Sequence, residues 1–292
     1  MKKSKLIGFS SLLAATFLYG FFGIFTRIIG FKLPLFFACW TRTLISAIIL
    51  FLPFLFLKNW VTVKKNDMKW IVARATSGLF GFFGSYIAFY NISIGTAYFI
   101  FYAGTLIWGY FLGRILFKEK LTFIKIVSLF LALGGLLLIY SLNFRTTNFI
   151  YALSALISGF GSATWSIFSK KISGRYSALQ LNFMDTFIMF LMVFILSLMI
   201  KEPWSWPNFS TPWLASLLFA GIFILTGQLM IYGFKHLDAQ IGSLIMLTEV
   251  LFGIILGFLF YKEVISLSIL IGGLIIIFSI ILPQFRKNTL TS

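Results

Sequence analysis

The segment Gly109–Glu119, GYFLGRILFKE, recurs 144 residues later as Gly253–Glu263, GIILGFLFYKE. Two glycines, one leucine and a final Lys-Glu pair occupy the same places in both copies. In each copy, an apolar stretch ends at the two charged residues. Self-similarity at a fixed spacing indicates that one structural unit is present twice in the chain.

The duplication also covers the sequence before this segment. A shift of 143 residues superposes Trp70, Gly78, Phe80 and Gly84 on Trp213, Gly221, Phe223 and Gly227. The same shift places Ile24–Arg27 on Ile167–Lys170, and one inserted residue near Asp238 accounts for the change from 143 to 144. We therefore expect two repeats, at residues 1–145 and 146–292.

The composition indicates that lipid is the solvent for most of the chain. Of the 292 residues, 60% are hydrophobic and 11% are charged, and the mean hydropathy is +1.01. Soluble domains carry about 25% charged residues. The apolar runs have the length of bilayer-crossing helices, about 20 residues, and lack the alternating segments of a transmembrane β-barrel. The expected fold class is all-α integral membrane.

Ten apolar runs follow one another along the chain. They are Leu6–Ile29, Pro34–Phe56, Trp70–Ile94, Thr96–Phe117, Phe123–Tyr140, Phe149–Phe168, Leu179–Ile200, Trp213–Phe234, Ile241–Phe260 and Leu267–Leu282. Because each repeat has five spans, an odd number, the second repeat is inverted relative to the first. Ten transmembrane helices arranged as two inverted five-helix repeats are typical of secondary transporters, whose substrate site lies at the repeat interface near the bilayer midplane.

The distribution of cations predicts the orientation in the membrane. Of the 24 Lys and Arg residues, 17 fall in the termini and loops of one side and 5 on the other. The positive-inside rule then places both termini in the cytoplasm. Lys2, Lys3 and Lys5 precede the first run in the manner of a signal peptide. That run continues to Ile29, too far for a cleaved signal, so we expect a multi-pass protein of the cytoplasmic (inner) membrane.

The same counts argue against other classes of protein. The net charge of +17 lies in short loops, where it meets lipid headgroups, and does not form the single basic face that nucleic acid needs. Cys39 and His236 are the only residues of their types, so no metal site or other cofactor is expected. The seven acidic residues make no metal-ligand pair, which disfavours an intramembrane enzyme. A membrane receptor or assembly scaffold without transport stays open as an alternative.

A family resemblance rests on Gly109–Ser128 and Gly253–Gly272, which close the fourth and ninth spans. The second copy reads TEVLFGIILG over Thr248–Gly257 and ends in Tyr261–Glu263. This segment resembles the paired motif E-P-x-x-a-x-x-x-G-x-l-x-x-x-E of EamA-type transporters in the drug/metabolite transporter superfamily. Arg42 matches an arginine that is frequent in the family's second helix. The family's proline is replaced by Val250 here and by Leu106 in the first copy.

The resemblance implies ten helices around a central cavity that opens alternately to the two sides of the membrane. It also implies a small-molecule substrate, a metabolite or drug that is imported or exported, with protons as a coupling ion in some members. It does not identify the substrate, the direction of transport, the coupling ion or the oligomeric state.

Ionisable residues inside the spans are the first candidates for function, because each costs about 2.5–3.5 kcal/mol at the centre of a bilayer helix. The 143-residue shift places Arg42 on Asp185, at equivalent depths of the second and seventh spans. We expect the two residues to belong to opposite gates. A neighbouring carbonyl or headgroup that satisfies each charge is the alternative.

Four other charges fall near run ends, where snorkelling or a loop ion pair explains them: Arg74, Arg114, Glu119 and Glu263. Lys118 and Lys262 are the expected countercharges of the two glutamates.

Uncharged polar and aromatic residues are candidates for the cavity wall. The candidates for binding substrate are Tyr86, Tyr102, Trp165, Asn182, Gln228 and Thr248, and the wider set includes Tyr19, Tyr90, Asn91 and Trp108. An interfacial aromatic belt is the alternative for Tyr and Trp. The glycine pairs Gly134-Gly135 and Gly272-Gly273 predict close contact between helices.

Glu249 is the strongest single candidate for binding substrate or a proton. It lies near the middle of the ninth run, about 12 Å from either end at 1.5 Å per residue. A glutamate side chain is too short to reach water from that depth, and its own helix offers no Lys or Arg within two turns. We expect Glu249 to take up and release a proton, or to pair with a cationic group of the substrate. A helix-packing hydrogen bond is the alternative.

Overall fold

The chain folds into helices and connecting loops. The computed structural model describes residues 3–29, 32–57, 60–140 and 148–285, and the expected repeat boundary at 145/146 lies outside them. The helices are α1 (Lys3–Ile29), α2 (Leu35–Leu57), α3 (Lys65–Asn91), α4 (Ile94–Phe117), α5 (Phe123–Ile139), α6 (Phe149–Ile172), α7 (Ala178–Met199), α8 (Thr211–His236), α9 (Ala239–Met246), α10 (Thr248–Tyr261) and α11 (Leu267–Phe285). The prediction of an all-α protein is confirmed.

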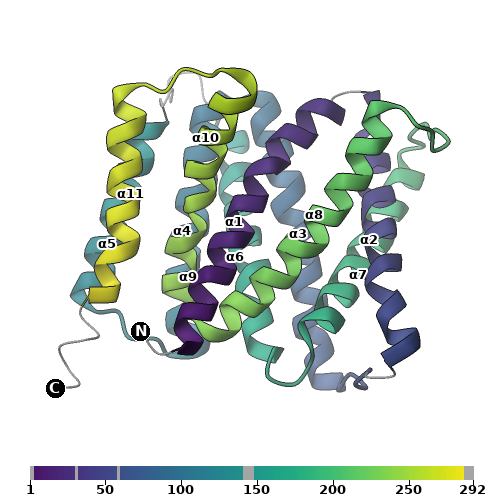
Figure 1. Ribbon diagram of the computed structural model, residues 1–292, viewed down its shortest axis with the longest axis horizontal. Helices are drawn as coiled ribbons and strands as arrows, with labels where there is room; N and C mark the ends of the chain where they lie inside the picture. The colour runs from purple at the N-terminus through teal and green to yellow at the C-terminus, as the bar shows by residue number, and fades with distance from the viewer. Residues whose placement is uncertain (1–2, 30–31, 58–59, 141–147, 286–292) are drawn as a thin grey trace.

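The helices form a bundle with two outer pairs and a central group (Figure 1). Helices α5 and α11 pack together at one edge of the bundle, and α2 and α7 pack together at the other edge. Between them, α1 packs on α8 and α3 packs on α6. These pairings follow the internal repeat, because each helix of the first repeat packs against a helix of the second.

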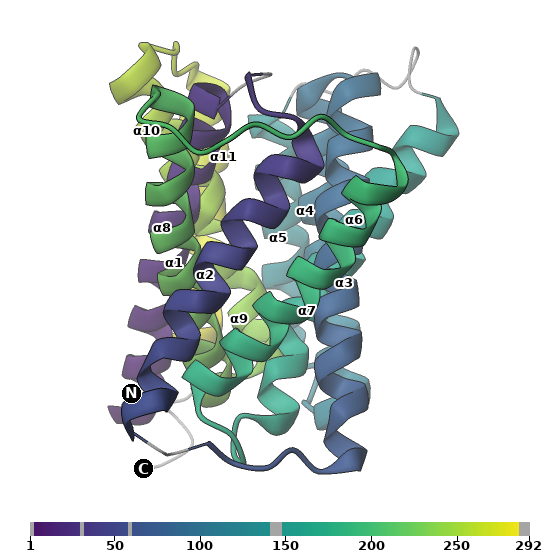
Figure 2. The ribbon, with the colours of Figure 1, turned by 90° about the vertical axis from the view of Figure 1, so that its right-hand side faces the viewer.

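Helix α1 begins and helix α11 ends at the same end of the bundle (Figure 1). We call this end, where α1 begins and α11 ends, the inner end, and the opposite one the outer end. At the outer end, the loop from α7 to α8 crosses the start of α2 (Figure 2). There the Glu202 carboxylate accepts hydrogen bonds from the backbone N–H groups of Phe36 (3.0 Å) and Phe37 (2.6 Å). These are two of the four donors that the start of a helix leaves without an intrahelical partner.

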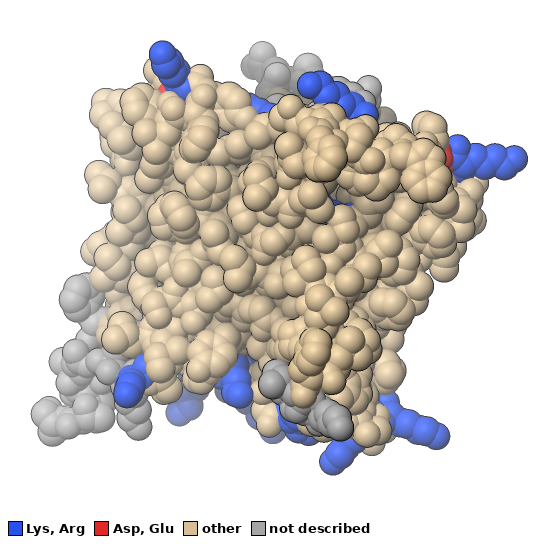
Figure 3. Space-filling view, turned by 45° about the vertical axis from the view of Figure 1, so that its right-hand side comes forward, with Lys and Arg blue, Asp and Glu red and all other residues tan. Residues whose placement is uncertain are grey.

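Among the described residues, eight segments are long and apolar enough to cross a membrane: α1, α2, α4, α6, α7, α8, α9 with α10, and α11. Two helices fall outside this set, because α3 is long but less apolar and α5 has only 17 residues. The space-filling view shows Lys and Arg at the two ends of the molecule and an uncharged belt between them (Figure 3). The protein therefore crosses the membrane several times.

The ninth run is not the single helix that the sequence predicts. It breaks at Leu247, where the backbone N–H of Leu247 donates to Leu244 O (3.1 Å) and that of Val250 donates to Leu247 O (3.1 Å). These three-residue steps replace the four-residue steps of an α-helix. The break forms although Val250 stands where the family has proline. Its counterpart in the first repeat, α4, is continuous.

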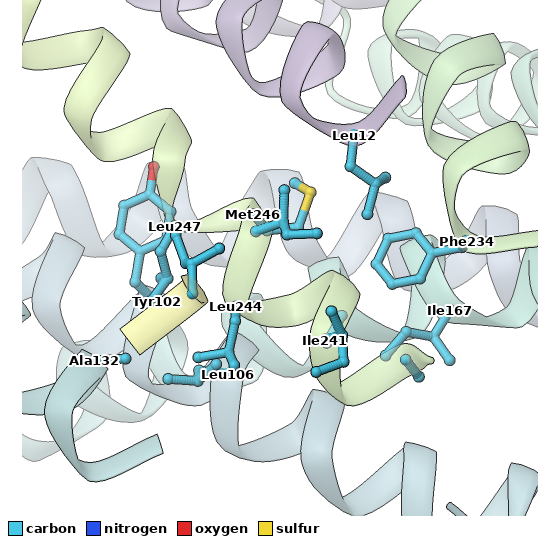
Figure 4. Close-up of a cluster of buried hydrophobic side chains, with 14 of the residues drawn as sticks. Leu12, Tyr102, Leu106, Ala132, Ile167, Phe234, Ile241, Leu244, Met246 and Leu247 are labelled. Carbon is cyan, nitrogen blue, oxygen red and sulfur yellow. The ribbon is translucent and has the colours of Figure 1, made fainter. Parts of the chain in front are cut away.

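Close packing joins the two repeats. The central apolar cluster draws side chains from α1, α4, α6, α8 and α9, with Leu106, Ile167 and Leu244 fully buried (Figure 4). At the α5–α11 contact, a Cβ atom at Gly135 would lie 2.7 Å from the carbonyl oxygen of Gly272. The contact therefore depends on the absence of a side chain, as the glycine pairs predict.

Candidate functional site

A buried ion pair lies in the inner half of the bundle. The Arg74 Nη1 atom of α3 is 3.2 Å from Asp185 Oδ2 of α7, and the two side chains are 2% and 1% exposed. Helix α3 begins at Lys65, so Arg74 lies about 13 Å along it at 1.5 Å per residue. The expectation that Arg74 snorkels from a helix end is wrong, because the helix starts before its apolar run.

Trp165 of α6 holds this pair in place. Its indole Nε1 donates a 2.6 Å hydrogen bond to Asp185 Oδ2, and its backbone carbonyl accepts a 2.8 Å hydrogen bond from Arg74 Nε. The Arg74 guanidinium also lies over the indole ring, 4.7 Å from its centroid, a favourable position for a cation. Among the described residues, the buried atoms Arg74 Nη2 and Asp185 Oδ1 have no hydrogen-bond partner.

Glu249 lies in the first turn of α10, directly after the break at Leu247. Residues 239–248 before it are all buried, whereas Glu249 itself is partly exposed. Its carboxyl group has a hydrogen-bonding neighbour in Tyr102 of α4, whose hydroxyl points toward the start of α10 (Figure 4). Within the described part of the chain, no Lys or Arg forms an ion pair with Glu249.

Four tyrosines lie near Glu249. Tyr98 stacks on Tyr102 and on Tyr140, with ring centroids 6.0 and 5.7 Å apart, and all three interact electrostatically with Glu249. Tyr19 of α1 interacts with Glu249 on one side and with the Arg74–Asp185 pair on the other. Of these four tyrosines, Tyr19 is the one that is near both the ion pair and Glu249.

The remaining substrate-site candidates make helix contacts or lie apart. The Thr248 and Thr16 hydroxyl oxygens are 2.7 Å apart and join α10 to α1. Asn182 Nδ2 donates a 3.0 Å hydrogen bond to Ile224 O of α8. Gln228, on α8, is partly buried, and its Nε2 has no partner among the described residues. The side chain of Tyr86 lies outside the described part of the structure.

Arg42 lies in the outer half of the bundle without an acidic partner among the described residues. Its guanidinium carbon is 4.1 Å from the centroid of the Phe219 ring, and its Nη2 atom is 3.8 Å from Cys39 Sγ. Asp185, its counterpart in the repeat, forms an ion pair with Arg74 through Oδ2. The two predicted gate residues therefore have different surroundings, one aromatic and one ionic.

The structure brings Asp185 together with Trp165, and Glu249 together with Tyr102. It adds Arg74, Tyr98 and Tyr140, which the sequence did not indicate as site residues. The four-residue spacing of Tyr98 and Tyr102, which places both on one face of a helix, was the one available signal. The pairing of Arg74 with Asp185 had none, because it joins helices far apart in the chain.

The apolar helical bundle defines a multi-pass membrane protein. No group of three or more potential metal-ligating His, Cys, Asp or Glu residues occurs in the described residues. The model of the EamA-like transporter family matches residues 6–141 and 149–283. The chain belongs to this family and is therefore a membrane transporter of the drug/metabolite transporter superfamily.

A solved structure supports the fold. It is described only as "Crystal structure of protein" and is similar over 100% of both chains, with a TM-score of 0.79 and 18% sequence identity. At this identity the likeness concerns the fold alone. No curated protein matches the chain significantly.

Proposed function

We propose that this protein is a secondary transporter, a permease or exporter, that moves a small metabolite or drug across the cytoplasmic membrane by alternating access. The observation that carries the proposal is Glu249, an acidic side chain at the interrupted ninth span with no cationic partner among the described residues. Interrupted helices at the interface of inverted repeats form the substrate and ion sites of many transporters.

Two roles fit Glu249 in this proposal. In the first, the carboxyl group takes up a proton from one side and releases it to the other, so that the proton gradient drives transport. In the second, the carboxylate pairs with a cationic group of the substrate, and the rings of Tyr98 and Tyr102 add cation–π attraction. Tyr19 and the free polar atoms of the Arg74–Asp185 pair then offer hydrogen bonds to the rest of the substrate.

Arg42 and Asp185 are proposed to act at opposite gates, because inverted repeats place them in opposite halves of the membrane. Arg42→Ala and Asp185→Ala should then bias the accessibility of the central site toward opposite sides. Thiol labelling of single cysteines in a Cys39→Ser background measures this bias. The same change in both variants, or no change in either, would reduce the two residues to structural roles.

Reconstitution tests the function directly. Purified protein in liposomes should accumulate at least one member of a panel of amino acids, nucleosides and cationic drugs faster than protein-free liposomes. The same panel should be screened for ligands that raise the melting temperature, since binding to the native state stabilises it. Compounds that stabilise the protein but never cross the membrane would favour a receptor or scaffold instead.

A further inference from the structure

Two ion pairs at opposite ends of the bundle are related by the internal repeat. At the inner end, Lys170 Nζ of α6 lies 2.8 Å from Glu119 Oε1, just after α4. At the outer end, Arg27 Nη2 of α1 lies 2.8 Å from Glu263 Oε1, just after α10. The shifts of 143 and 144 residues place Arg27 on Lys170 and Glu119 on Glu263. Neither glutamate pairs with the adjacent lysine that the sequence suggests.

The inner pair is part of a closed cluster, which we call the inner latch: Glu119, Lys170 and the start of α9. The Glu119 carboxylate accepts hydrogen bonds from the backbone N–H groups of Ala239 (2.6 Å) and Gln240 (3.1 Å). Lys170 Nζ also donates to Leu237 O (2.7 Å). Glu119 thereby caps α9, satisfies its terminal donors and meets the positive end of its dipole. The side chains of Glu119 and Lys170 are only 7% and 18% exposed.

The outer pair lacks this second set of contacts. The side chains of Arg27 and Glu263 are 58% and 50% exposed, and Arg27 is the one hydrogen-bonding or ionic partner of the Glu263 carboxylate among the described residues. The positions equivalent to Ala239 and Gln240 are Gly95 and Thr96, at the start of α4. By symmetry, Glu263 would cap α4 as Glu119 caps α9, but in this structure it does not.

Two polar contacts next to the inner latch are not repeated in the sequence. Lys125 Nζ donates to Gln240 Oε1 (2.7 Å), and the Tyr110 hydroxyl donates to Lys125 O (3.0 Å). The residues equivalent to Lys125 and Tyr110 in the second repeat are Ile269 and Ile254. Each glutamate and its cationic partner are therefore kept in both repeats while these neighbouring polar groups are not.

We propose that Glu119 and Glu263 are alternating helix caps, and that this structure is the state in which the inner end is latched and the outer end is not. In the opposite state Glu119 releases the start of α9, and Glu263 binds the backbone N–H groups at the start of α4. The inference rests on the proposed alternating access, since it assigns the residues that hold each end closed.

Thiol labelling in a Cys39→Ser background tests the inner latch without any substrate. The reporter is Ser243→Cys on α9, because Ser243 is 2% exposed and lies one turn behind the latch. Glu119→Gln removes the ion pair with Lys170 and one acceptor for the α9 backbone. It should raise the labelling rate in nanodiscs about tenfold, the factor that corresponds to losing one charge-assisted hydrogen bond. Glu263→Gln, the matched control, should not raise it.

The double variant tests the alternation itself. If Glu263 stabilises the state that Glu119→Gln exposes, then Glu263→Gln in that background should lower the labelling of Ser243→Cys back toward the wild-type rate. A labelling rate equal to that of Glu119→Gln alone would overturn the role of Glu263. No increase in Glu119→Gln, with a melting temperature that confirms a folded protein, would overturn the latch.

These outcomes separate the inference from the proposed function. Altered labelling in a protein that transports no compound of the panel would support the caps and count against transport. Unaltered labelling in Glu119→Gln, in a protein that transports normally, would count against the caps alone.

Discussion

The ion pair between Arg74 and Asp185 predicts how substitutions at these residues change the stability of the folded protein. Asp185→Asn leaves the Arg74 guanidinium buried without a countercharge, which typically costs about 3–5 kcal/mol. The additional change Arg74→Gln removes that charge, so the double variant should recover part of the lost stability. Thermal unfolding of the wild type, Asp185→Asn and the double variant in detergent measures both steps. A melting temperature that Asp185→Asn leaves unchanged would contradict the assignment of this pair.

The proposed role of Glu249 predicts how transport is coupled to a proton gradient. Glu249→Gln keeps the size and hydrogen-bonding capacity of the side chain but can neither carry a proton nor neutralise a cation. In proteoliposomes with an imposed pH gradient, the variant should lose gradient-driven accumulation and keep its melting temperature. Thr248→Ser, which retains the hydroxyl next to Thr16, is a suitable control at the adjacent position. Accumulation with unchanged pH dependence in Glu249→Gln would remove Glu249 from the mechanism.

Two adjacent glycines at the contact between α5 and α11 should respond differently to substitution by alanine. A Cβ atom at Gly135 would meet the Gly272 carbonyl oxygen at 2.7 Å, whereas one at Gly134 meets nothing within 4 Å. Gly135→Ala should therefore destabilise the protein by about 1–3 kcal/mol through overpacking, and Gly134→Ala should be close to neutral. Thermal unfolding compares the two variants. Equal melting temperatures of the two variants would contradict the close contact at Gly135.

The break between α9 and α10 shows how a helix can be interrupted without proline. Thr248 Oγ1 donates to the Ile245 carbonyl (2.8 Å) and lies against Thr16 of α1, so a side chain binds a backbone group near the break. The equivalent segment of α4 has no corresponding break. The two repeats therefore differ at the place where the proposed site lies, and Glu249 is found in one of them only.

The orientation in the membrane is a prediction for the entire protein. If both termini are cytoplasmic, Asn66→Cys at the start of α3 should resist an impermeant thiol reagent added to intact cells, while Asn208→Cys at the outer end should react. Both residues are exposed, and the buried Cys39 is replaced by serine in both variants. Labelling of Asn66→Cys from outside would contradict the predicted orientation.

The sequence alone determined the all-helical membrane fold, the family and the duplication, because the length of an apolar run and the spacing of a repeat are properties of the linear chain. It also located Trp165, Asp185 and Glu249 as polar groups within apolar runs. The ten-span count, both repeat boundaries and the gate roles stay predictions.

Only the tertiary structure decided which charges meet. Arg74 pairs with Asp185, and Glu119 pairs with Lys170 across 51 residues, although a nearer lysine adjoins Glu119. A long side chain can reach several partners, and the choice among them depends on which helices pack together and how each is rotated. The break at Leu247 also could not be predicted, because no proline or glycine marks this position in the sequence.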